Sequence, residues 1–396
     1  MLDLFKTVLM KKFLFIFLLF FSIQFSAQVI EKAILLKDVD TNLPIEDATI
    51  LVMKPKLLYL TNSEGKVNFK LNGISNIQIT HPSYIGITIR SIILKDKETI
   101  VLLKSNENKL EEIILTKQHP QKILINLITN SIKTLTVPAR LKVYSREFFK
   151  LNGVNTYYND GLINFQLFSK SKKFNSNILV EQNRSFGLVE DNVNSELLGY
   201  NLNDIMENYY NFKYLNPILD AKAKKEYDFI IKGYSDDANY YKMTIIPLEE
   251  AKGLLDNYTI IYDYKKKLII EVNSVVLPVT IAKTKDKKSI GSRNIYKSIY
   301  KSIYRFDGNN YYLLSSKEEI GFERIDKNKK TEIEVKNYLM TTNFSTQNYS
   351  FKDSEVFKDK TLFNKKNEIL SDYWNISGLT ATEEEKEIIE KIEKEQ

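Results

Sequence analysis

The chain has 396 residues, carries a net charge of +7 and contains no cysteine. Without cysteine, disulfides, thiolate metal sites and thiol nucleophiles are all excluded. A chain of this length can bury enough apolar surface for two domains, which must then be held together by their cores. The positive charge lies in short clusters such as Lys265-Lys266-Lys267. We interpret these clusters as solvated turns and predict no nucleic-acid partner.

The N-terminus has the layout of an export signal. Lys11 and Lys12 precede an unbroken apolar run at residues 13–21, and Ala27 offers a small residue for cleavage. The run is shorter than the roughly 20 apolar residues that span a membrane, so residues 1–27 are predicted to be a cleaved signal peptide. Met1 and Met10 are both candidate start residues. We expect the mature chain in the periplasm, at the outer membrane or outside the cell, with no transmembrane span.

Residues 28–116 are predicted to form an all-β sandwich, because short apolar runs alternate with turn signals about every 8–12 residues. Pro44 fixes φ ahead of a turn, and Asn62-Ser63-Glu64-Gly65 has the composition of a tight hairpin. The candidate strands are residues 30–37, 48–53, 57–61, 67–71, 74–80, 85–94 and 99–103.

The same region carries several sequence landmarks. They are a Pro-x-x-x-Ala step from Pro44 to Ala48, a Thr-Asn-x-x-Gly-x-Val-x-Phe hairpin at residues 61–69, the segment Ser83-Tyr84-Ile85-Gly86, and a Leu-x-Glu-Ile exit at residues 110–113. With these landmarks the region resembles the carboxypeptidase regulatory-like domain, a transthyretin-like β-sandwich of cell-envelope proteins in Bacteroidetes-type bacteria. The resemblance implies a sandwich of the seven-stranded type. Because the landmarks are turn and core residues, it implies no active site.

A second region begins after His119-Pro120. In the linking segment 117–138, apolar residues recur every three or four positions, which predicts an amphipathic helix. Residues 139–350 alternate by two and predict a larger antiparallel β domain. The expected hairpins join residues 227–232 to 240–246, 258–264 to 268–276, and 294–306 to 311–316, with a further strand at 331–341.

Three features of this second region and the C-terminus stand apart. The repeated Ile-Tyr-Lys-Ser pattern at residues 295–305 predicts one long strand with both faces partly covered. Residues 201–211 predict a short helix with Leu202, Ile205 and Met206 inward, acting as a lid or plug. The C-terminal segment 351–396 contains Tyr373-Trp374 and then an acidic helix at 383–395. That helix has an apolar stripe at Ile388, Ile389 and Ile392 that is expected to dock on the body or on a partner.

A packed helix followed by successive long antiparallel strands is similar in architecture to the open half-barrel of periplasmic lipoprotein carriers. The predicted fold class is therefore mainly β with a few helices, a sandwich followed by a half-barrel-like sheet. The resemblance implies an apolar ligand held by the sheet. With 24 Tyr and 22 Phe in the chain, a Tyr-lined sheet is a candidate surface for an acyl chain or a sugar ring.

No constellation for bond-making chemistry is recognised in the sequence. His81 and His119 lack partners at metal-ligand or triad spacing. Asp236-Asp237 is interpreted as a hairpin tip rather than a calcium site, since further acidic ligands are missing. Adjacent carboxylates such as Glu249-Glu250 and Glu318-Glu319 point to opposite faces of a strand, and we interpret them as surface charges.

We therefore predict no catalytic, cofactor-binding or metal-binding residue and no cofactor, and the residues of a binding site are unknown. The leading hypothesis is a non-enzymatic cell-envelope protein whose Tyr-rich β domain binds another envelope protein or an apolar ligand. The alternatives are a periplasmic lipid or lipoprotein carrier and an envelope hydrolase with an unrecognised active site. An open cup at residues 140–345 would favour a carrier, and a filled one would favour a scaffold.

Overall fold

The computed structural model describes residues 29–106, 113–169, 174–187, 201–234, 239–277, 293–326, 329–347, 349–363, 365–370 and 378–394. The predicted signal peptide, residues 110–112 of the sandwich exit, Asp236-Asp237 and Tyr373-Trp374 lie outside these residues. Within them, no helix is both long enough and apolar enough to cross a membrane.

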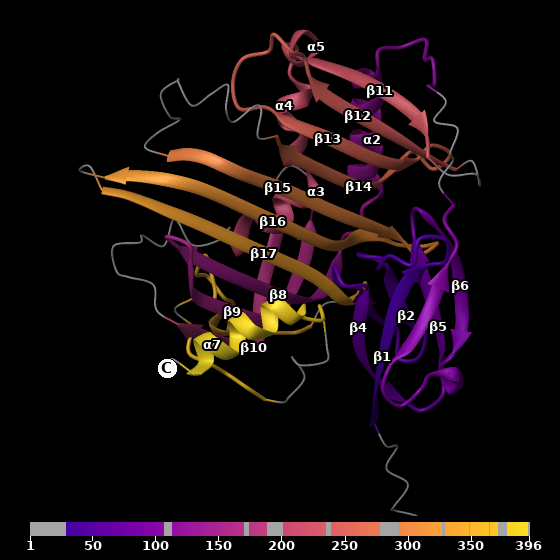
Figure 1. Cartoon of the computed structure of the whole chain (residues 1–396), viewed down its shortest axis with the longest axis vertical. Coiled ribbons are helices and arrows are strands. Elements are labelled where there is room, and N and C mark those ends of the chain that lie inside the picture. Colours follow the sequence, from indigo (N-terminus) through magenta and orange to yellow (C-terminus); the bar gives the residue numbers. More distant parts are fainter. Residues whose placement is uncertain are drawn as a thin grey trace, which may run out of the picture.

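The described chain is mainly β, as the sequence predicted. Its strands form a three-stranded sheet, a four-stranded sheet and a ten-stranded antiparallel sheet (Figure 1). The two small sheets come from the N-terminal residues, and the large sheet comes from everything after the first long helix.

The two small sheets pack face to face as a sandwich. One has the order β4-β1-β7 and the other the order β3-β2-β5-β6. Alternate residues of both sheets meet in a core that includes Ile34, Phe69, Ile50 and Ile79, as period-two burial requires. The strands are β1 Val29–Asp38, β2 Thr49–Val52, β3 Leu57–Leu60, β4 Lys66–Asn72, β5 Asn76–His81, β6 Tyr84–Arg90 and β7 Thr99–Leu103.

One strand of the sandwich is shorter than predicted. The sequence favoured a strand over residues 85–94, but β6 ends at Arg90 and the 3₁₀ helix η1 follows at Ser91–Ile93. The backbone of Ser91 is tied back to Ser75, since Ser91 N donates to Ser75 O at 2.8 Å and Ser75 N donates to Ser91 Oγ at 3.0 Å. These contacts pull the chain out of the sheet, and no single-residue preference signals them.

The ten-stranded sheet has the order β10-β9-β8-β17-β16-β15-β14-β13-β12-β11. All three predicted hairpins are present, and the predicted strand at residues 331–341 extends the sheet beside β16. The strands are β8 Ala139–Leu151, β9 Val154–Ser169, β10 Asn175–Gly187, β11 Tyr227–Gly233, β12 Tyr240–Pro247, β13 Asp256–Asp263, β14 Leu268–Val276, β15 Arg293–Phe306, β16 Tyr311–Asp326 and β17 Lys329–Ser345.

Helices cover one face of this sheet, which we call the inner face. The predicted amphipathic helix is α2, Pro120–Thr134, and the predicted short helix is α3, Leu202–Tyr210. Leu202, Ile205 and Met206 point inward as expected. The short elements η3 (Lys213–Leu215), α4 (Asn216–Leu219) and α5 (Ala223–Glu226) complete this layer.

The opposite face of the sheet, the outer face, is covered by different parts of the chain. The sandwich packs on one end of β15–β17, where Leu58 and Leu60 meet Ile303, Tyr312 and Met340. The C-terminal helix α7, Glu383–Lys394, lies across β8–β10 on the same face (Figure 1). The repeat at residues 295–305 lies in one strand, β15, and both of its faces are partly covered, as predicted.

Short segments also pair with both edge strands of the large sheet. Ile113 bridges to Lys232 of β11, and Ile114 N donates to Ile231 O at 2.9 Å. At the other edge, Glu368 and Asn183 of β10 exchange backbone hydrogen bonds of 2.9 and 3.1 Å. Such cover limits pairing with other chains at these positions.

Two glycines of the sandwich provide a matched test of turn geometry. Both Gly65 (φ +72°) and Gly73 (φ +79°) are left-handed, but a Cβ on Gly65 would lie 2.5 Å from Leu36 O, whereas one on Gly73 would meet nothing within 4 Å. We expect Gly73→Ala to lower the free energy of unfolding by about 1 kcal/mol and Gly65→Ala by more than roughly 2 kcal/mol. Urea unfolding of both variants measures the difference, and equal losses would contradict the crowding at Gly65.

Candidate functional site

The Tyr-rich surface that the sequence offered for an apolar ligand is closed in this structure. Tyr258, Tyr300, Tyr304 and Tyr311 of the strands all point to the inner face and are buried against the helix layer. Tyr209 of α3 is buried among them, with its ring stacked on that of Tyr300 at 5.9 Å. The rings therefore form the core between sheet and helices rather than an open cup.

A row of polar side chains crosses this inner face at one level. In register across five neighbouring strands lie Asn159, Glu147, Asn337, Glu318 and Tyr300. All five are buried. Side chains that face each other across adjacent strands interact directly, so the row forms a continuous polar band beneath α3.

Glu318 is held by the helix layer itself. Its Oε1 accepts hydrogen bonds from Tyr209 OH at 3.0 Å and Tyr214 OH at 2.6 Å. The ring of Tyr214 also stacks on Tyr300, with 4.1 Å between centroids. Burial raises the pKa of Glu318 above its usual value, and the two hydroxyl donors oppose that rise. Tyr209 of α3 and Tyr214 of η3 thus supply the hydrogen bonds that this buried carboxyl group of the sheet needs.

Glu147 is less well satisfied than Glu318. Asn159 Nδ2 donates to its Oε1 at 2.9 Å. Burial raises the pKa of Glu147 to about 7, against the opposing effect of that hydrogen bond. A cavity of about 20 Å³, large enough for one water molecule, adjoins it and is also lined by Ser145, Asn337 and Thr361.

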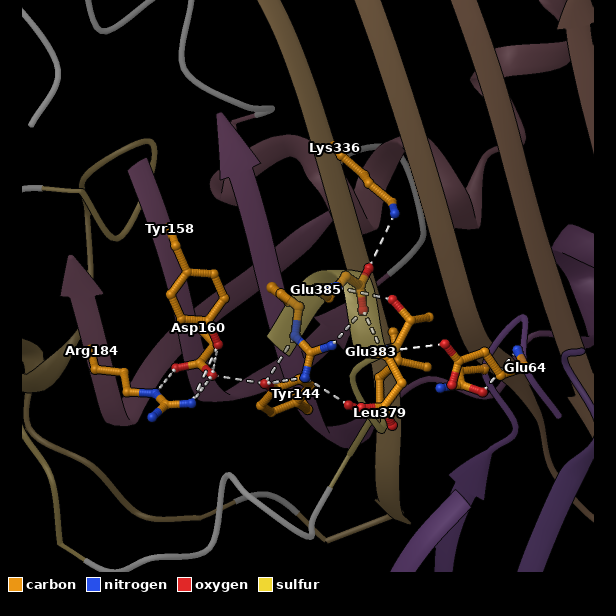
Figure 2. A network of polar contacts seen from close by, with 12 residues as sticks. Glu64, Tyr144, Tyr158, Asp160, Arg184, Lys336, Leu379, Glu383 and Glu385 are labelled. Carbon is orange, nitrogen blue, oxygen red and sulfur yellow. Dashed lines mark hydrogen bonds and ion pairs between the residues drawn. The ribbon is translucent and has the colours of Figure 1, made fainter. Parts of the chain in front are cut away.

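On the outer face, a buried charge network joins three strands to the C-terminus (Figure 2). Asp160 is fully buried and accepts hydrogen bonds from Tyr144, Tyr158 and Arg184. The guanidinium of Arg184 contacts both carboxylate oxygens, at 2.8 and 3.0 Å. A buried carboxylate needs paired partners of this kind, because water is not available to solvate it.

Arg146 connects this cluster to the C-terminal segment. Its Nη2 donates to Tyr144 OH at 2.9 Å and to Leu379 O at 2.7 Å. Its Nη1 lies 3.3 Å from Glu385 Oε2, while Lys336 Nζ lies 3.1 Å from Glu385 Oε1. Burial raises the pKa of Glu385, but the charges of Arg146 and Lys336 outweigh it and hold that pKa below its usual value.

We call residues 378–394 the C-terminal clasp, because they touch both the sheet and the sandwich. Thr382 and Glu385 cap the start of α7 reciprocally, each donating its backbone N–H to the other's side chain at 3.1 Å. On the sandwich side, Asn68 N donates to Thr380 Oγ1 at 2.8 Å, and Lys66 pairs with Glu383 at 3.3 Å. The predicted docking of the apolar stripe on the body is observed, since Ile388, Ile389 and Ile392 meet Phe148, Tyr158, Phe186 and Tyr338.

Two cavities flank the Lys336–Glu385 pair. A cleft of about 70 Å³ lies between the sandwich, the sheet and the clasp, and it is also lined by Glu46, Asp47 and Lys301. Lys301 lies 2.7 Å from Asp47 and 3.3 Å from Glu271.

The second cavity is a groove of about 280 Å³ between α7 and strands β8 and β15–β17. Lys150, Lys297 and Glu334 line it together with Phe148 and Ile388. Charged side chains, including Glu384 and Glu385 of α7, therefore line this groove together with a few apolar ones.

Each of the two histidines accepts a hydrogen bond from a nearby backbone N–H. His119 is exposed and caps α2, with its Nδ1 accepting from Gln121 N at 3.1 Å. His81 Nδ1 accepts from Ser83 N at 3.0 Å. Burial and then the charge of Lys301 lower the pKa of His81 to about 4, although Asp47 opposes the shift. Both side chains act as local hydrogen-bond acceptors. Among the described residues, no group of three or more His, Asp or Glu could hold a metal ion.

One interpretation of the sequence is wrong. Glu318 and Glu319 were expected to be surface charges, but both are buried. They do lie on opposite faces, with Glu318 under the helix layer and Glu319 paired to Lys297 at 2.6 Å on the outer face. Alternation correctly placed the two carboxylates on opposite faces, but it does not show that protein covers both faces of the sheet at this point. Glu249 and Glu250 are exposed, as predicted.

Sequence reasoning also missed the outer network. Arg146 and Arg184 sit at ordinary alternating positions of long strands, and their burial depends on a helix more than 190 residues later. The available signal was local: Tyr144 stands two residues before Arg146 on β8, and Tyr158 stands two residues before Asp160 on β9. A strand with charged residues flanked by aromatic ones favours a covered face.

No protein-family model and no curated protein matches the chain. Among solved structures, it is similar to a DUF1329 family protein from Desulfovibrio piger, with a TM-score of 0.27, 11% identity, and 63% of this chain and 98% of that chain covered. It is also similar to a LolA superfamily protein from Nitrosomonas europaea, with a TM-score of 0.21, 11% identity, and 59% and 97% covered. Likenesses at these TM-scores do not define the fold or function of this chain.

The raised pKa of Glu147 gives a pH-dependent stability with a definite sign. Its pKa is higher in the folded protein than the usual 4.5, so ionisation of Glu147 costs stability as the pH rises from about 4.5 to about 7. The Gln of Glu147→Gln does not ionise, so this variant avoids that loss. The unfolding free energy of the variant minus that of the unaltered protein should therefore be roughly 2 kcal/mol larger at about pH 8 than at about pH 5. Urea unfolding at both pH values measures this.

A control of opposite sign is Glu385→Gln. Because the pKa of Glu385 is lowered, its stabilising contribution is present above its usual pKa and lost as the pH falls through the folded value. Glu385→Gln should therefore cost more stability at the higher pH. If both variants change with pH in the same direction, the assignment of the two environments is wrong.

The Arg146–Glu385 pair should behave as a buried ion pair. Arg146→Met leaves Glu385 without its buried partner, and we expect it to lower the unfolding free energy by about 3–5 kcal/mol. The double variant Arg146→Met/Glu385→Leu should recover much of that loss, because both buried charges are gone and Lys336, which also pairs with Glu385, is about one-third exposed to solvent. Urea unfolding of the four proteins in the cycle measures the coupling, and additive losses would rule the pair out as a coupled unit.

Proposed function

We propose that this chain is a non-enzymatic protein of the bacterial cell envelope that binds a protein partner on the outer face of its large sheet. The observation that carries the proposal is the arrangement of the two faces. The inner face is filled by the chain's own helices, whereas the outer face holds the groove of about 280 Å³ beside α7. A groove lined by both charged and apolar side chains can serve as a protein recognition surface.

The same proposal includes where the protein lies in the cell and what each of its two β domains does. The export signal predicted at residues 1–27 supports an envelope location, at the periplasm or the outer membrane. We also propose that residues 28–116 are a sandwich of the carboxypeptidase regulatory-like type, and that it serves to brace the β domain of residues 139–350. The contact of Leu58 and Leu60 with the sheet and the clasp at its edge support this bracing role.

The non-enzymatic part of the proposal is supported by the occupied roles of the polar groups. His81 and His119 accept local backbone hydrogen bonds, and Glu318 is satisfied by two tyrosines. Turnover on a panel of hydrolase substrates that a single substitution abolishes would overturn this part.

A photo-crosslinking amino acid in place of Asn155, which lines the groove, tests partner binding in the native host. We expect one discrete adduct of protein mass in the envelope fraction. The matched control carries the same group in place of Ile125, an exposed residue of α2. Adducts of equal yield at both positions, or adducts at neither, would contradict a partner site on the outer face.

A second candidate function is carriage of an apolar ligand, which the aromatic inner face favours. If α3 and η3 withdrew, Tyr300 and Glu318 would lose Tyr209 and Tyr214 and offer rings and a carboxyl group to an amphiphile. Native mass spectrometry of protein purified from its host would then show a co-purifying lipid. If no lipid co-purifies and the Asn155 adduct forms, partner binding is favoured over carriage of an apolar ligand.

A further inference from the structure

The surface beneath α7 combines fixed charges with an aromatic patch. Arg146 and Lys336 meet Glu385 near the start of the helix, and Arg184 lies 3.6 Å from Glu393 near its end. Between these ends, Phe148, Tyr158, Phe186 and Tyr338 receive the isoleucines of α7.

The contacts of α7 follow a simple spacing. Relative to Glu385, the isoleucines stand at positions +3, +4 and +7 and Glu393 at position +8. This is the spacing of one face of a helix, and it is how grooves recognise amphipathic helices presented by other proteins. The two acidic residues at the ends fix register and direction, because each meets its own cationic partner.

The chain's own helix occupies this surface incompletely. Ile392 is buried, whereas Ile388 and Ile389 are only half-buried. The groove of about 280 Å³ runs beside Ile388 and Phe148, so the position of Ile388 has unfilled space next to it. A helix with a larger side chain there would bury more apolar surface than α7 does.

We propose that the outer face of β8–β10 and β17 is a helix-recognition site, kept occupied by α7 and open to a competing amphipathic, acidic helix carried by the protein partner. This inference rests on the proposed function and names its recognition element. The partner helix carries acidic residues at the positions of Glu385 and Glu393, with apolar residues between them and a bulky one at the position of Ile388.

The experiment uses the full chain with its own helix weakened and a labelled peptide of residues 378–394 as the probe. Ile392→Ser removes the one buried isoleucine of α7. Fluorescence anisotropy should show the peptide binding this variant at least about tenfold more tightly than the unaltered protein, since the internal competitor is weaker. Circular dichroism confirms that the variant remains folded, and absence of peptide binding to folded Ile392→Ser protein would overturn the proposal.

Changed peptides test the geometry without altering the protein. Ile388→Phe in the peptide should tighten binding roughly fivefold by filling the groove. The matched control, Ile392→Phe, enlarges a side chain that is already buried against Phe148 and Tyr158 and should weaken binding about tenfold. Glu385→Gln in the peptide should also weaken binding about tenfold, through loss of the charge-assisted contacts. If Ile388→Phe and Ile392→Phe change affinity alike, the groove is not part of the site and the proposal fails.

The outcomes also separate this inference from the function it deepens. If Asn155 forms an adduct with a host protein but the peptides do not bind, the proposed partner function is supported. The proposal that the partner presents a helix to this site would then be wrong. Light scattering tests whether the competing helix comes from a second copy of this chain. If the unaltered protein is a dimer and Glu393→Gln makes it monomeric, the helix does not come from a different protein, and that part of the proposal is wrong.

Discussion

Cover on both faces of the ten-stranded sheet is the constraint on which the rest of this structure depends. Strands β8 and β9 contain long runs of consecutive buried residues that include polar side chains such as Arg146 and Asp160, so both of their faces are covered there. The inner face is closed by α2 and α3, and the outer face by the sandwich and the clasp. An antiparallel sheet usually needs cover on one face only. Here the second cover turns alternating polar residues into buried ones.

The buried polar groups on the two faces of the sheet have different kinds of partners. On the inner face, neutral donors from inserted tyrosines satisfy Glu318, and Glu147 keeps a proton more readily than a solvated carboxyl group does. On the outer face, cations stand against anions, as in the contact of Arg184 with Asp160. Paired charges specify a partner's register more sharply than apolar contacts do, because a mismatch leaves a charge buried and unpaired. Together with the groove beside α7, that difference favours the outer face as the place of recognition.

The clasp links these features to the arrangement of the whole molecule. It reaches from Lys66 of the sandwich to Arg146 in the sheet within a few residues, so it fixes the sandwich and the sheet relative to each other. Gly378 permits this close approach, because a Cβ there would lie 2.4 Å from the ring of Tyr144. A helix held mainly by charges at its ends and one buried isoleucine is well suited to exchange with a similar helix.

The sequence by itself determined the mainly β class, the strands of the sandwich, the helix after Pro120 and the hairpins of the large sheet. Each of these follows from local periodicity and turn chemistry, such as the turn at Asn62 that Gly65 completes. Only the tertiary structure decided that Glu318 is buried, that the inner face is filled, and that Arg146 meets Glu385. These contacts join residues far apart in the chain, and a period-two pattern cannot show whether a polar face meets water or a second layer of protein.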